Sequence, residues 1–381
     1  MYCYTQNLPY NKFVKKKIIF YHPSFQDGGV EKTNLLISAK LSKKYDIFFL
    51  SHYFSNKFDK EIKRYGIKKI LIPSSRALFG SLDIVRVYKK IKPDLIFSIQ
   101  THANVLTLMI NKFFFKNDLK IVCCERLSKK KYESYFKGKI IIFLAKLFYR
   151  YSKIVICNSK ELAKEFKNIS SNLKVIHIYN PTLKLNLSSL SKKFKIKTEP
   201  FFSKKNPIIF SLGRLDYIKN NLMLLKAYNE IKHKLKCDIV LMGDGNKKKE
   251  LINYAKKNDF YKNLFIFKFQ KNPYPFLLKS DIFVLSSRAE GLPNVLIEAL
   301  ALKKFVISTK CPTGPKEILL NGKAGLLVDV DDHIDLASKI KIYFEKPEVV
   351  KKKKKFIKKS LLQFSPNKSL NKYQKVVESL L

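Results

Sequence analysis

Two glutamates in one apolar stretch are the residues of this sequence best suited to chemistry. The segment RAEGLPNVLIEALAL, residues 288–302, reads as a turn followed by a helix, and Glu290 and Glu298 interrupt its apolar run. Burying an unpaired carboxylate costs roughly several kcal/mol. We therefore expect the two acids to hold partners, which are either polar groups of a ligand or nearby lysines such as Lys303 and Lys304.

The spacing of the acids places a helix N-terminus between them. Pro293 suits the first turn of a helix, and Glu298 then lies about 7.5 Å further along at 1.5 Å per residue, which is too far for both acids to act on one atom. The free N–H groups of Asn294 and Val295 lie between them and favour a phosphate. A nucleotide sugar has hydroxyl groups at both ends and a diphosphate between them, and it fits this layout.

Residues after two further predicted strands supply positive charge and close backbone approach. The segment SLGRLDYIKN turns at Gly213 and brings Arg214 and Lys219 near the start of the next helix. We expect both cations to neutralise the diphosphate through charge-assisted hydrogen bonds. In LMGDGNKKKEL, Gly243 lacks a side chain and so allows a close backbone approach.

The elements that position these residues alternate along the whole chain. Short β-branched runs are separated by enough residues for crossover helices, which predicts βαβ units and parallel sheets. The predicted strands lie at 16–22, 45–52, 67–73, 94–100, 119–125, 153–159, 173–180, 207–213, 237–243, 263–269, 281–287, 305–310 and 325–329. In the second half, helices are expected near 220–235, 246–258, 273–279, 293–302 and 315–320.

The alternation is interrupted by one segment rich in Ser, Lys and Pro. We predict a first domain over 1–183, a linker over 184–205, a second domain over 206–350, and one or two closing helices over 351–381 that pack back toward the first domain. Two doubly wound domains that face each other place a ligand in the cleft between them, on the loops after the carboxyl ends of the strands.

The combined motifs resemble a known family. The pattern E-G-x-P-x-x-x-x-E, which is a Glu-x7-Glu arrangement, follows GRL…KN and precedes GPKEIL…G.AGLLV. Together these motifs resemble the retaining glycosyltransferases of family 4 over nearly the whole second half of the chain, and less extensively over the first half. The resemblance implies the GT-B fold, an α/β fold with two facing Rossmann-like doubly wound parallel-sheet domains and a cleft between them.

The resemblance also implies a role for each donor-site residue. Glu298 would bind the ribose, Glu290 the transferred sugar, and Arg214 and Lys219 the diphosphate. The glycines of PSFQDGGVEKTN match the family's loop after the first strand and would let the backbone reach the diphosphate from the opposite wall. The predicted donor-binding residues are Gly28, Gly29, Gly213, Arg214, Lys219, Gly243, Phe269, Glu290, Gly291, Leu292, Pro293, Asn294, Val295 and Glu298.

Acceptor-side residues come from two loops of the first half. By the resemblance, His102 and Asn104 of KPDLIFSIQTHANV and Glu125 and Arg126 of VCCERLS occupy these loops. Many family members carry a His where this chain has CERLS. We therefore take His102 as a catalytic candidate beside Glu290, Arg214 and Lys219, with a packed, hydrogen-bonded histidine as the alternative. Where relatives often have a Gly after the strand at 263–267, this chain has Lys268-Phe269-Gln270.

Two further motifs invite other chemistry. VDVDD, residues 328–332, contains a D-x-D pattern, which we interpret as a polar loop because it follows the last predicted strand, away from the helix that carries Glu298. MGDGN resembles part of a dinucleotide-binding loop, but a Lys stands where the third Gly belongs. We expect no cofactor and no metal, because fixed cations and a helix dipole can stabilise the departing phosphate.

The net charge of +46, from 76 Lys and Arg against 30 Asp and Glu, indicates a polyanionic neighbour or a Lys-biased proteome. The lysines are dispersed and no nucleic-acid-binding module is evident, so we expect no nucleic-acid partner. Two basic, aromatic segments, 106–117 and 137–153, predict contact with an anionic membrane surface, with a helix packed on the sheet as the alternative.

The remaining features concern the compartment. The six cysteines show no C-x-x-C spacing, the N-terminus lacks a secretory pattern, and no stretch of 18 uncharged apolar residues occurs. We expect a cytoplasmic protein with reduced cysteines, peripheral on the cytoplasmic face of the inner membrane.

The predicted function is retaining transfer from a nucleotide diphosphate sugar to a hydroxyl of a glycan or lipid-linked saccharide, in envelope polysaccharide, lipopolysaccharide or glycoprotein biosynthesis. The loop STKCPTGPKEIL resembles that of family members that transfer N-acetylhexosamines, which favours a UDP-linked donor. The alternatives are a nucleotide-sugar epimerase on the same fold and a basic nucleic-acid-binding protein.

Overall fold

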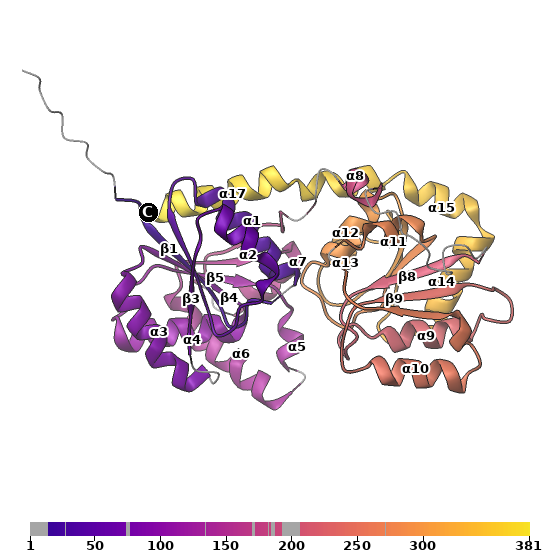
Figure 1. Cartoon of the computed structure of the whole chain (residues 1–381), viewed down its shortest axis with the longest axis horizontal. Coiled ribbons are helices and arrows are strands. Elements are labelled where there is room, and N and C mark those ends of the chain that lie inside the picture. Colours follow the sequence, from indigo (N-terminus) through magenta and orange to yellow (C-terminus); the bar gives the residue numbers. More distant parts are fainter. Residues whose placement is uncertain are drawn as a thin grey trace, which may run out of the picture.

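Two parallel sheets, each flanked by helices, make up the structure (Figure 1). It is a computed structural model that describes residues 14–26, 28–73, 77–133, 135–169, 172–181, 183, 187–192, 206–270 and 272–381. Every strand of both sheets overlaps a strand predicted from the sequence. The prediction of an α/β fold with two parallel-sheet units is therefore confirmed.

The N-terminal lobe is built on a seven-stranded sheet of order β3-β2-β1-β4-β5-β6-β7. Its strands are β1 (Lys17–His22), β2 (Asp46–Ser51), β3 (Lys68–Leu71), β4 (Leu95–Ile99), β5 (Ile121–Glu125), β6 (Ile154–Cys157) and β7 (Val175–His177). Its helices are α1 (Gly29–Leu41), α2 (Asp59–Arg64), α3 (Ala77–Ile91), α4 (Thr101–Phe114), α5 (Lys129–Glu133), α6 (Phe136–Phe148) and α7 (Lys160–Lys167).

The C-terminal lobe is built on a six-stranded sheet of order β10-β9-β8-β11-β12-β13. Its strands are β8 (Ile208–Leu212), β9 (Asp238–Met242), β10 (Leu264–Phe267), β11 (Ile282–Leu285), β12 (Phe305–Thr309) and β13 (Leu326–Val328). Its helices are α9 (Asn221–Asn229), α10 (Lys248–Lys257), α11 (Tyr274–Lys279), α12 (Asn294–Ala301), α13 (Pro315–Ile318) and α14 (His333–Glu345).

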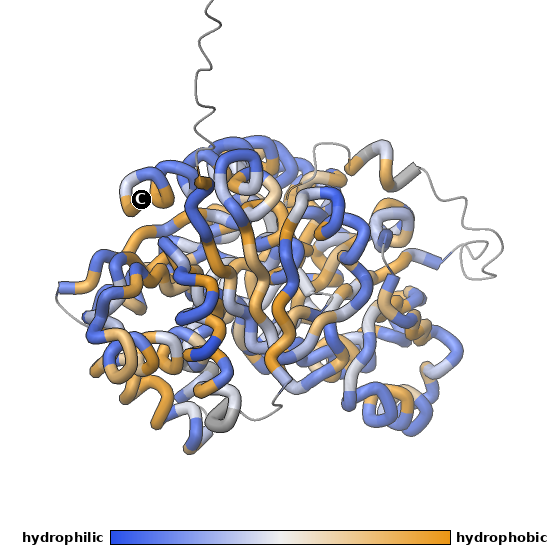
Figure 2. Tube along the Cα trace, turned by 60° about the vertical axis from the view of Figure 1, so that its left-hand side comes forward, coloured by the Kyte–Doolittle hydropathy of each residue, from blue (hydrophilic) through white to orange (hydrophobic). Residues whose placement is uncertain are grey.

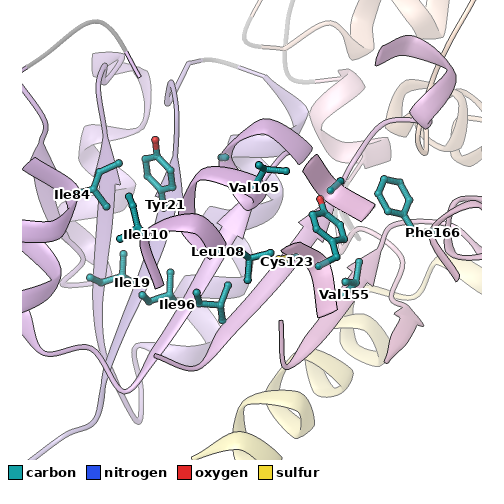
Figure 3. Close-up of a cluster of buried hydrophobic side chains, with 14 of the residues drawn as sticks. Ile19, Tyr21, Ile84, Ile96, Val105, Leu108, Ile110, Cys123, Val155 and Phe166 are labelled. Carbon is teal, nitrogen blue, oxygen red and sulfur yellow. The ribbon is translucent and has the colours of Figure 1, made fainter. Parts of the chain in front are cut away.

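The strands are apolar because both faces of each sheet are covered. Along the tube in Figure 2, hydrophobic strand segments run through the interior and hydrophilic segments concentrate outside. One core of the N-terminal lobe is a single buried cluster that includes Ile19 and Ile96 of the sheet, Leu108 of α4 and Phe166 of α7 (Figure 3). The cysteines at 123, 124, 157, 237 and 311 are free and buried, which agrees with their prediction as reduced core residues, and Cys3 lies outside the described residues.

The predicted linker is described only in part. Residues 184–186 and 193–205 lie outside the described residues, as does the N-terminal segment 1–13. Between the first two of these ranges the chain forms a short helix, α8 (Leu187–Lys192), which the sequence analysis did not predict. Leu187 is buried against α11, and Asn272 Nδ2 donates to the Leu190 carbonyl at 2.9 Å, so this segment packs on the C-terminal lobe.

The C-terminal segment crosses from one lobe to the other (Figure 1). It contains α15 (Pro347–Lys354), α16 (Ile357–Leu361) and α17 (Pro366–Leu380), where the sequence indicated one or two helices. A break falls before Pro366, which has no N–H to continue a helix but suits the first turn of a new one. Helix α17 lies against α1, and its Tyr373 and Val377 are buried with Phe20 and Leu35 in the N-terminal lobe.

Candidate active site

Glu290 lies on the loop after β11 and is buried, with 7% of its surface exposed. Its Oε1 accepts hydrogen bonds from Lys219 Nζ and from Ser287 Oγ, each at 2.6 Å. The backbone carbonyl of Glu290 accepts a further hydrogen bond from the Thr313 hydroxyl. The loop is thus fixed from both sides, and the predicted phosphate cation Lys219 is paired with the predicted sugar-binding acid.

Glu298 lies on α12 and is 5% exposed, but its lysine partner is not one of those considered from the sequence. Lys32 of α1, in the opposite lobe, places its Nζ 3.3 Å from Glu298 Oε1. The same oxygen accepts from the Tyr274 hydroxyl at 3.1 Å. Lys304 instead donates to the Ser280 carbonyl, so the local pairing alternative for Glu298 does not occur.

The N-termini of α1 and α12 face each other across the two lobes. A Cβ placed on Gly29 would lie 3.1 Å from Asn294 Nδ2. Asn294 also accepts at its Oδ1 from Asn180 Nδ2 at 3.0 Å, so the first residue of α12 is held by the N-terminal lobe. Both helix starts carry partial positive charge, and the arrangement favours an anion between them.

The predicted glycines permit close packing at three points. A Cβ on Gly291 would lie 1.9 Å from the Arg126 carbonyl oxygen of the opposite lobe. A Cβ on Gly243, whose φ is +146°, would lie 2.0 Å from the Gly213 carbonyl oxygen, and one on Gly28 would lie 2.7 Å from a Glu31 carboxylate oxygen. In the same loop as Gly291, the remaining predicted donor residues Leu292 and Pro293 are buried and Val295 is half-buried.

Two predicted donor residues lie apart from the glutamates. Arg214 is exposed, and its Nε pairs with Asp216 Oδ2 at 3.1 Å rather than with either glutamate. Phe269 is 41% exposed and stacks under Lys57 of the N-terminal lobe, with Nζ 3.8 Å from the ring centroid. Both cations were predicted to bind the diphosphate, which stays a prediction; here Asp216 on the same turn holds the Arg214 guanidinium, whereas Lys219 pairs with Glu290.

Two of the predicted acceptor-side residues are buried together at the carboxyl end of β5. Glu125 is fully buried and accepts from Asn104 Nδ2 at 2.6 Å, from Thr101 Oγ1 at 2.8 Å and from the Tyr149 hydroxyl. Burial raises the pKa of Glu125 to about 7. Since neither Glu125 nor Asn104 has an exposed surface, both serve the interior of the lobe, and direct contact with an acceptor is not supported.

Arg126 is also buried, with 4% of its surface exposed, and it joins three segments. Its guanidinium donates to Asn180 Oδ1 at 2.9 Å, to Asn34 Oδ1 at 3.3 Å and to the Tyr373 hydroxyl at 3.3 Å. Arg126 therefore ties α17 and α1 to the segment that holds Asn294. This role differs from the predicted contact with the acceptor, because the side chain points into the lobe.

The third acceptor-side element is the first turn of α4, where His102 is exposed. Gln100 precedes this turn with a φ of +84°, an uncommon backbone conformation for a residue other than glycine. The sequence offered a packed, hydrogen-bonded histidine as the alternative for His102; the side chain is exposed rather than packed in the core, and its catalytic role stays a prediction.

The acids of VDVDD are each engaged by neighbouring side chains or backbone. Asp331 accepts from Arg288 at 2.6 Å and from Asn220 at 2.9 Å, while Asp329 pairs with Lys310 at 3.0 Å. Asp332 caps α14 by accepting from the Asp335 N–H. Within the described ranges, no group of three or more His, Cys, Asp or Glu side chains is arranged to hold a metal ion.

A second interlobe contact was not anticipated from the sequence, and we call it the helix-cap region (Lys160, Glu161, Gly314 and Glu317). Glu317 of the C-terminal lobe accepts from the Lys160 N–H at the start of α7, at 3.0 Å and 3.3 Å. In return, Glu161 of α7 accepts from the Gly314 N–H before α13 at 2.9 Å. Each lobe thus places a carboxylate on a backbone N–H at a helix N-terminus of the other lobe. The Tyr179 hydroxyl also donates to Glu317.

Comparison with known proteins decides the family. Residues 192–361 match the family described as glycosyl transferases group 1. An uncharacterised glycosyltransferase of Methanocaldococcus jannaschii is 31% identical over 301 residues, which cover 74% of this chain and 72% of that protein. The chain belongs to the group 1 glycosyltransferases. It is therefore an enzyme that transfers glycosyl groups, which confirms the predicted enzyme class.

Two further likenesses extend over most of this glycosyltransferase. The Campylobacter jejuni enzyme named N-acetylgalactosamine-N,N'-diacetylbacillosaminyl-diphospho-undecaprenol 4-alpha-N-acetylgalactosaminyltransferase is 28% identical over 84% of this chain and 88% of its own length. The crystal structure of Anabaena Alr3699/HepE in complex with UDP-glucose superposes with a TM-score of 0.80 at 18% identity, covering 95% of this chain and 99% of that one. The fold is GT-B, as predicted.

Proposed function

We propose that this glycosyltransferase moves a sugar from a UDP-linked donor to a hydroxyl of a glycan or lipid-linked saccharide, with retention of configuration at the anomeric carbon. Within the group 1 enzymes, its Glu-x7-Glu pattern favours the retaining family 4. The observation that carries the proposal is the pair of buried acids, Glu290 and Glu298, on either side of the α12 N-terminus and opposite α1.

In this proposal each part of the donor has a partner in the protein. Glu298 hydrogen-bonds the ribose hydroxyls, and Glu290 hydrogen-bonds the transferred sugar. The diphosphate lies between the N-termini of α1 and α12, where helix dipoles and unpaired N–H groups favour negative charge. Lys219 lies 2.6 Å from Glu290 and so stands where the sugar joins the phosphate, and Arg214 reaches the site only by leaving Asp216.

The chemistry follows from this placement. The bond between the anomeric carbon and the β-phosphate oxygen breaks, the acceptor oxygen bonds to that carbon on the same face, and the acceptor proton passes to the departing phosphate. Negative charge grows on the diphosphate during this step. Preorganised positive groups such as Lys219 and the α12 N-terminus each stabilise such charge by about 2–4 kcal/mol. We accordingly expect transfer to proceed in the presence of a metal chelator.

Similarity to named proteins supports the donor and acceptor classes. The Anabaena structure binds UDP-glucose, and the Campylobacter enzyme acts on a diphospho-undecaprenol-linked saccharide. A lipid-linked acceptor requires the enzyme to reach a membrane surface. We therefore extend the proposal to peripheral association with the cytoplasmic face of an anionic membrane. No helix in the described part of the chain is long and apolar enough to span a bilayer.

Helix α6 presents the face that such a surface would contact. Phe136, Ile140, Phe143 and Leu147 recur with helical spacing along it and are 78%, 45%, 60% and 43% exposed. Exposed basic residues border this stripe at Lys137, Lys139, Lys146 and Arg150. Phe113, at the end of α4, is 68% exposed and lies 6.2 Å from the Phe148 ring. Apolar side chains bordered by cations favour an anionic lipid interface.

A donor panel tests the transfer reaction. UDP-N-acetylhexosamines and UDP-glucose are incubated with a polyprenyl-diphosphate-linked saccharide, and UDP release and product mass are measured with and without the acceptor. We expect UDP release that depends on the acceptor and a product whose anomeric configuration, read by NMR, matches the donor. Nucleotide release without any acceptor would favour an epimerase, and an inverted product would refute retention.

Sedimentation with vesicles tests the membrane face. The wild-type protein should sediment with phosphatidylglycerol vesicles at low salt and less so as salt rises. The double variant Phe136→Ser, Phe143→Ser should lose most of this binding, whereas Leu362→Ser, which alters an apolar residue 66% exposed on another surface, should retain it. Equal binding by all three proteins would exclude α6 as the contact.

A further inference from the structure

Lys32 is a cation of the N-terminal lobe that contacts Glu298 of the opposite lobe. Its Nζ lies 3.3 Å from Glu298 Oε1 and 3.5 Å from the Tyr274 hydroxyl. The Lys32 side chain is 27% exposed, whereas that of Glu298 is 7% exposed. The carboxylate is therefore the buried partner of the pair, and the lysine reaches it from the more open side.

Two ion pairs flank the α12 N-terminus, and Glu31 adds a buried carboxylate in the first turn of α1, where it accepts from the Gln26 N–H. Lys219 neutralises Glu290 and Lys32 neutralises Glu298, one pair on each side of the α12 start. A diphosphate that enters between the helices brings additional negative charge. The site then needs a cation that is free to change partners.

Donor binding itself would free Lys32. In the proposed function the ribose hydroxyls hydrogen-bond to Glu298, so they compete with Lys32 for the same carboxylate. A lysine ammonium is a point charge on a flexible four-carbon chain, so it can change partners by side-chain rotation. Lys32 lies three residues into α1 from Gly29, about 4.5 Å along the helix axis, and stays within reach of an anion at the α1 N-terminus.

We propose that Lys32 is an exchangeable cation of the donor site: it neutralises Glu298 in the free enzyme and pairs with the donor diphosphate once the ribose occupies Glu298. This inference rests on the proposed function, because it requires a nucleoside diphosphate whose ribose contacts Glu298. It adds a residue that binds phosphate from the lobe opposite Lys219.

Binding of UDP and of uridine separates this role from a structural one. Uridine carries the ribose but no phosphate. For Lys32→Gln we expect UDP affinity to fall roughly 10- to 100-fold, as for the loss of one charge-assisted hydrogen bond. Uridine affinity should stay the same or rise, since the ribose no longer competes with a lysine. Wild-type UDP affinity should also depend more steeply on salt than that of the variant.

Two further variants serve as controls for calorimetry. Lys43→Gln removes the same charge from an exposed lysine just beyond the end of α1 and should bind UDP like the wild type. Lys32→Arg keeps the cation and should stay within a few-fold of the wild type, which guards against misfolding as the cause of a loss. Circular dichroism melts of all variants report on folding.

Each other result overturns the inference. Equal weakening of UDP and uridine by Lys32→Gln would show that Lys32 only positions Glu298. Tighter binding of both would show that it only holds the lobes together, and unchanged binding of both would show that it has no part in the site. If wild-type protein binds UDP but Lys32→Gln is unaffected, only this inference fails. If wild-type protein does not bind UDP, the proposed donor fails as well.

Discussion

Two regions join the lobes through glutamates, and they use different partners. In the lysine–glutamate region (Lys32, Lys219, Glu290 and Glu298), each acid pairs with the ammonium of a lysine, at 3.3 Å and 2.6 Å. In the helix-cap region, Glu161 and Glu317 accept from backbone N–H groups at 2.9 Å and 3.0 Å.

The difference in partner indicates a difference in task. A lysine side chain can rotate away from its carboxylate when a ligand offers hydroxyl groups, because these hydroxyls then donate hydrogen bonds to the carboxylate. A backbone N–H at a helix start is fixed by the helix and has no other partner within it. The lysine–glutamate region is therefore suited to exchange partners with a ligand, whereas the helix-cap region is suited to hold the lobes in place.

The largest expected effect follows from Glu290→Gln. This change leaves Lys219 without its counter-ion and removes the carboxylate proposed to contact the transferred sugar. We expect kcat/KM for sugar transfer to fall by about 100-fold or more, as for the loss of a preorganised charged group. Steady-state assays with the UDP-linked donor measure it. Glu250→Gln, an exposed acid paired with Lys247, should remain near wild type, and an active Glu290→Gln enzyme would remove Glu290 from the site.

The next largest expected effect is on stability and concerns the buried Glu125, which has hydrogen-bond donors but no ion-pair partner among the described contacts. Glu125 accepts hydrogen bonds from hydroxyl and amide groups, and burial raises its pKa from an ordinary value of 4.5 to about 7. Between these values the folded state holds a proton that the unfolded state has lost. The contribution of Glu125 to the free energy of unfolding therefore falls as pH rises through this window, by on the order of 3 kcal/mol.

The variant Glu125→Gln isolates that contribution. Urea unfolding at pH 5, 6, 7 and 8 should show the wild type losing stability relative to the variant as pH rises. A constant difference between the two proteins across this range would mean that Glu125 does not change protonation on folding, and its hydroxyl and amide partners would then be stabilising the charged form.

The variant Glu298→Gln tests whether Glu298 contacts the ribose or the phosphates of the donor. Because the proposed role is a ribose contact, we expect affinities for UDP and uridine to fall together, by roughly 10-fold, as for one hydrogen bond to a charged group. Calorimetry measures both ligands. A loss confined to UDP would instead assign Glu298 to the phosphates, through its partner Lys32.

The sequence predicted what depends on local pattern. Strands such as β4 and β11 are apolar on both faces, so their composition marks them without further information. Glu290 and Glu298 were found because acids inside an apolar run are unusual. Pro293 marks a helix start for a similar local reason, since a proline lacks an N–H, and it lies at the N-cap of α12.

Contacts between segments that are distant in the chain could not be predicted, because no local sequence pattern marks them. Lys32 and Glu298 are 266 positions apart, and in a chain with 76 Lys and Arg one lysine attracts no attention. The only available signal was its place one helical turn after Gly28–Gly29. Glu125 and Arg126 read as loop residues at a strand end, whereas Tyr149 and Tyr373 from later helices cover them. Burial of this kind is set by the tertiary fold.

The smallest expected effect on activity comes from the helix-cap region, and it tests the comparison most directly. Removing one N-terminal cap costs about 0.5–2 kcal/mol, so Glu161→Gln and Glu317→Gln should each lower the free energy of unfolding by roughly 1 kcal/mol. Both should keep transfer activity within a few-fold at saturating donor, because neither residue contacts the donor in the proposed function. Thermal or urea unfolding gives the free energy of unfolding, and initial rates give the transfer activity.

Glu348→Gln is the matched control, since Glu348 lies in the first turn of α15 on an exposed surface, where its loss should cost less than about 0.5 kcal/mol. A large loss of kcat with unchanged stability would mean that the caps position the donor site, and the division between exchangeable and fixed glutamates would no longer hold.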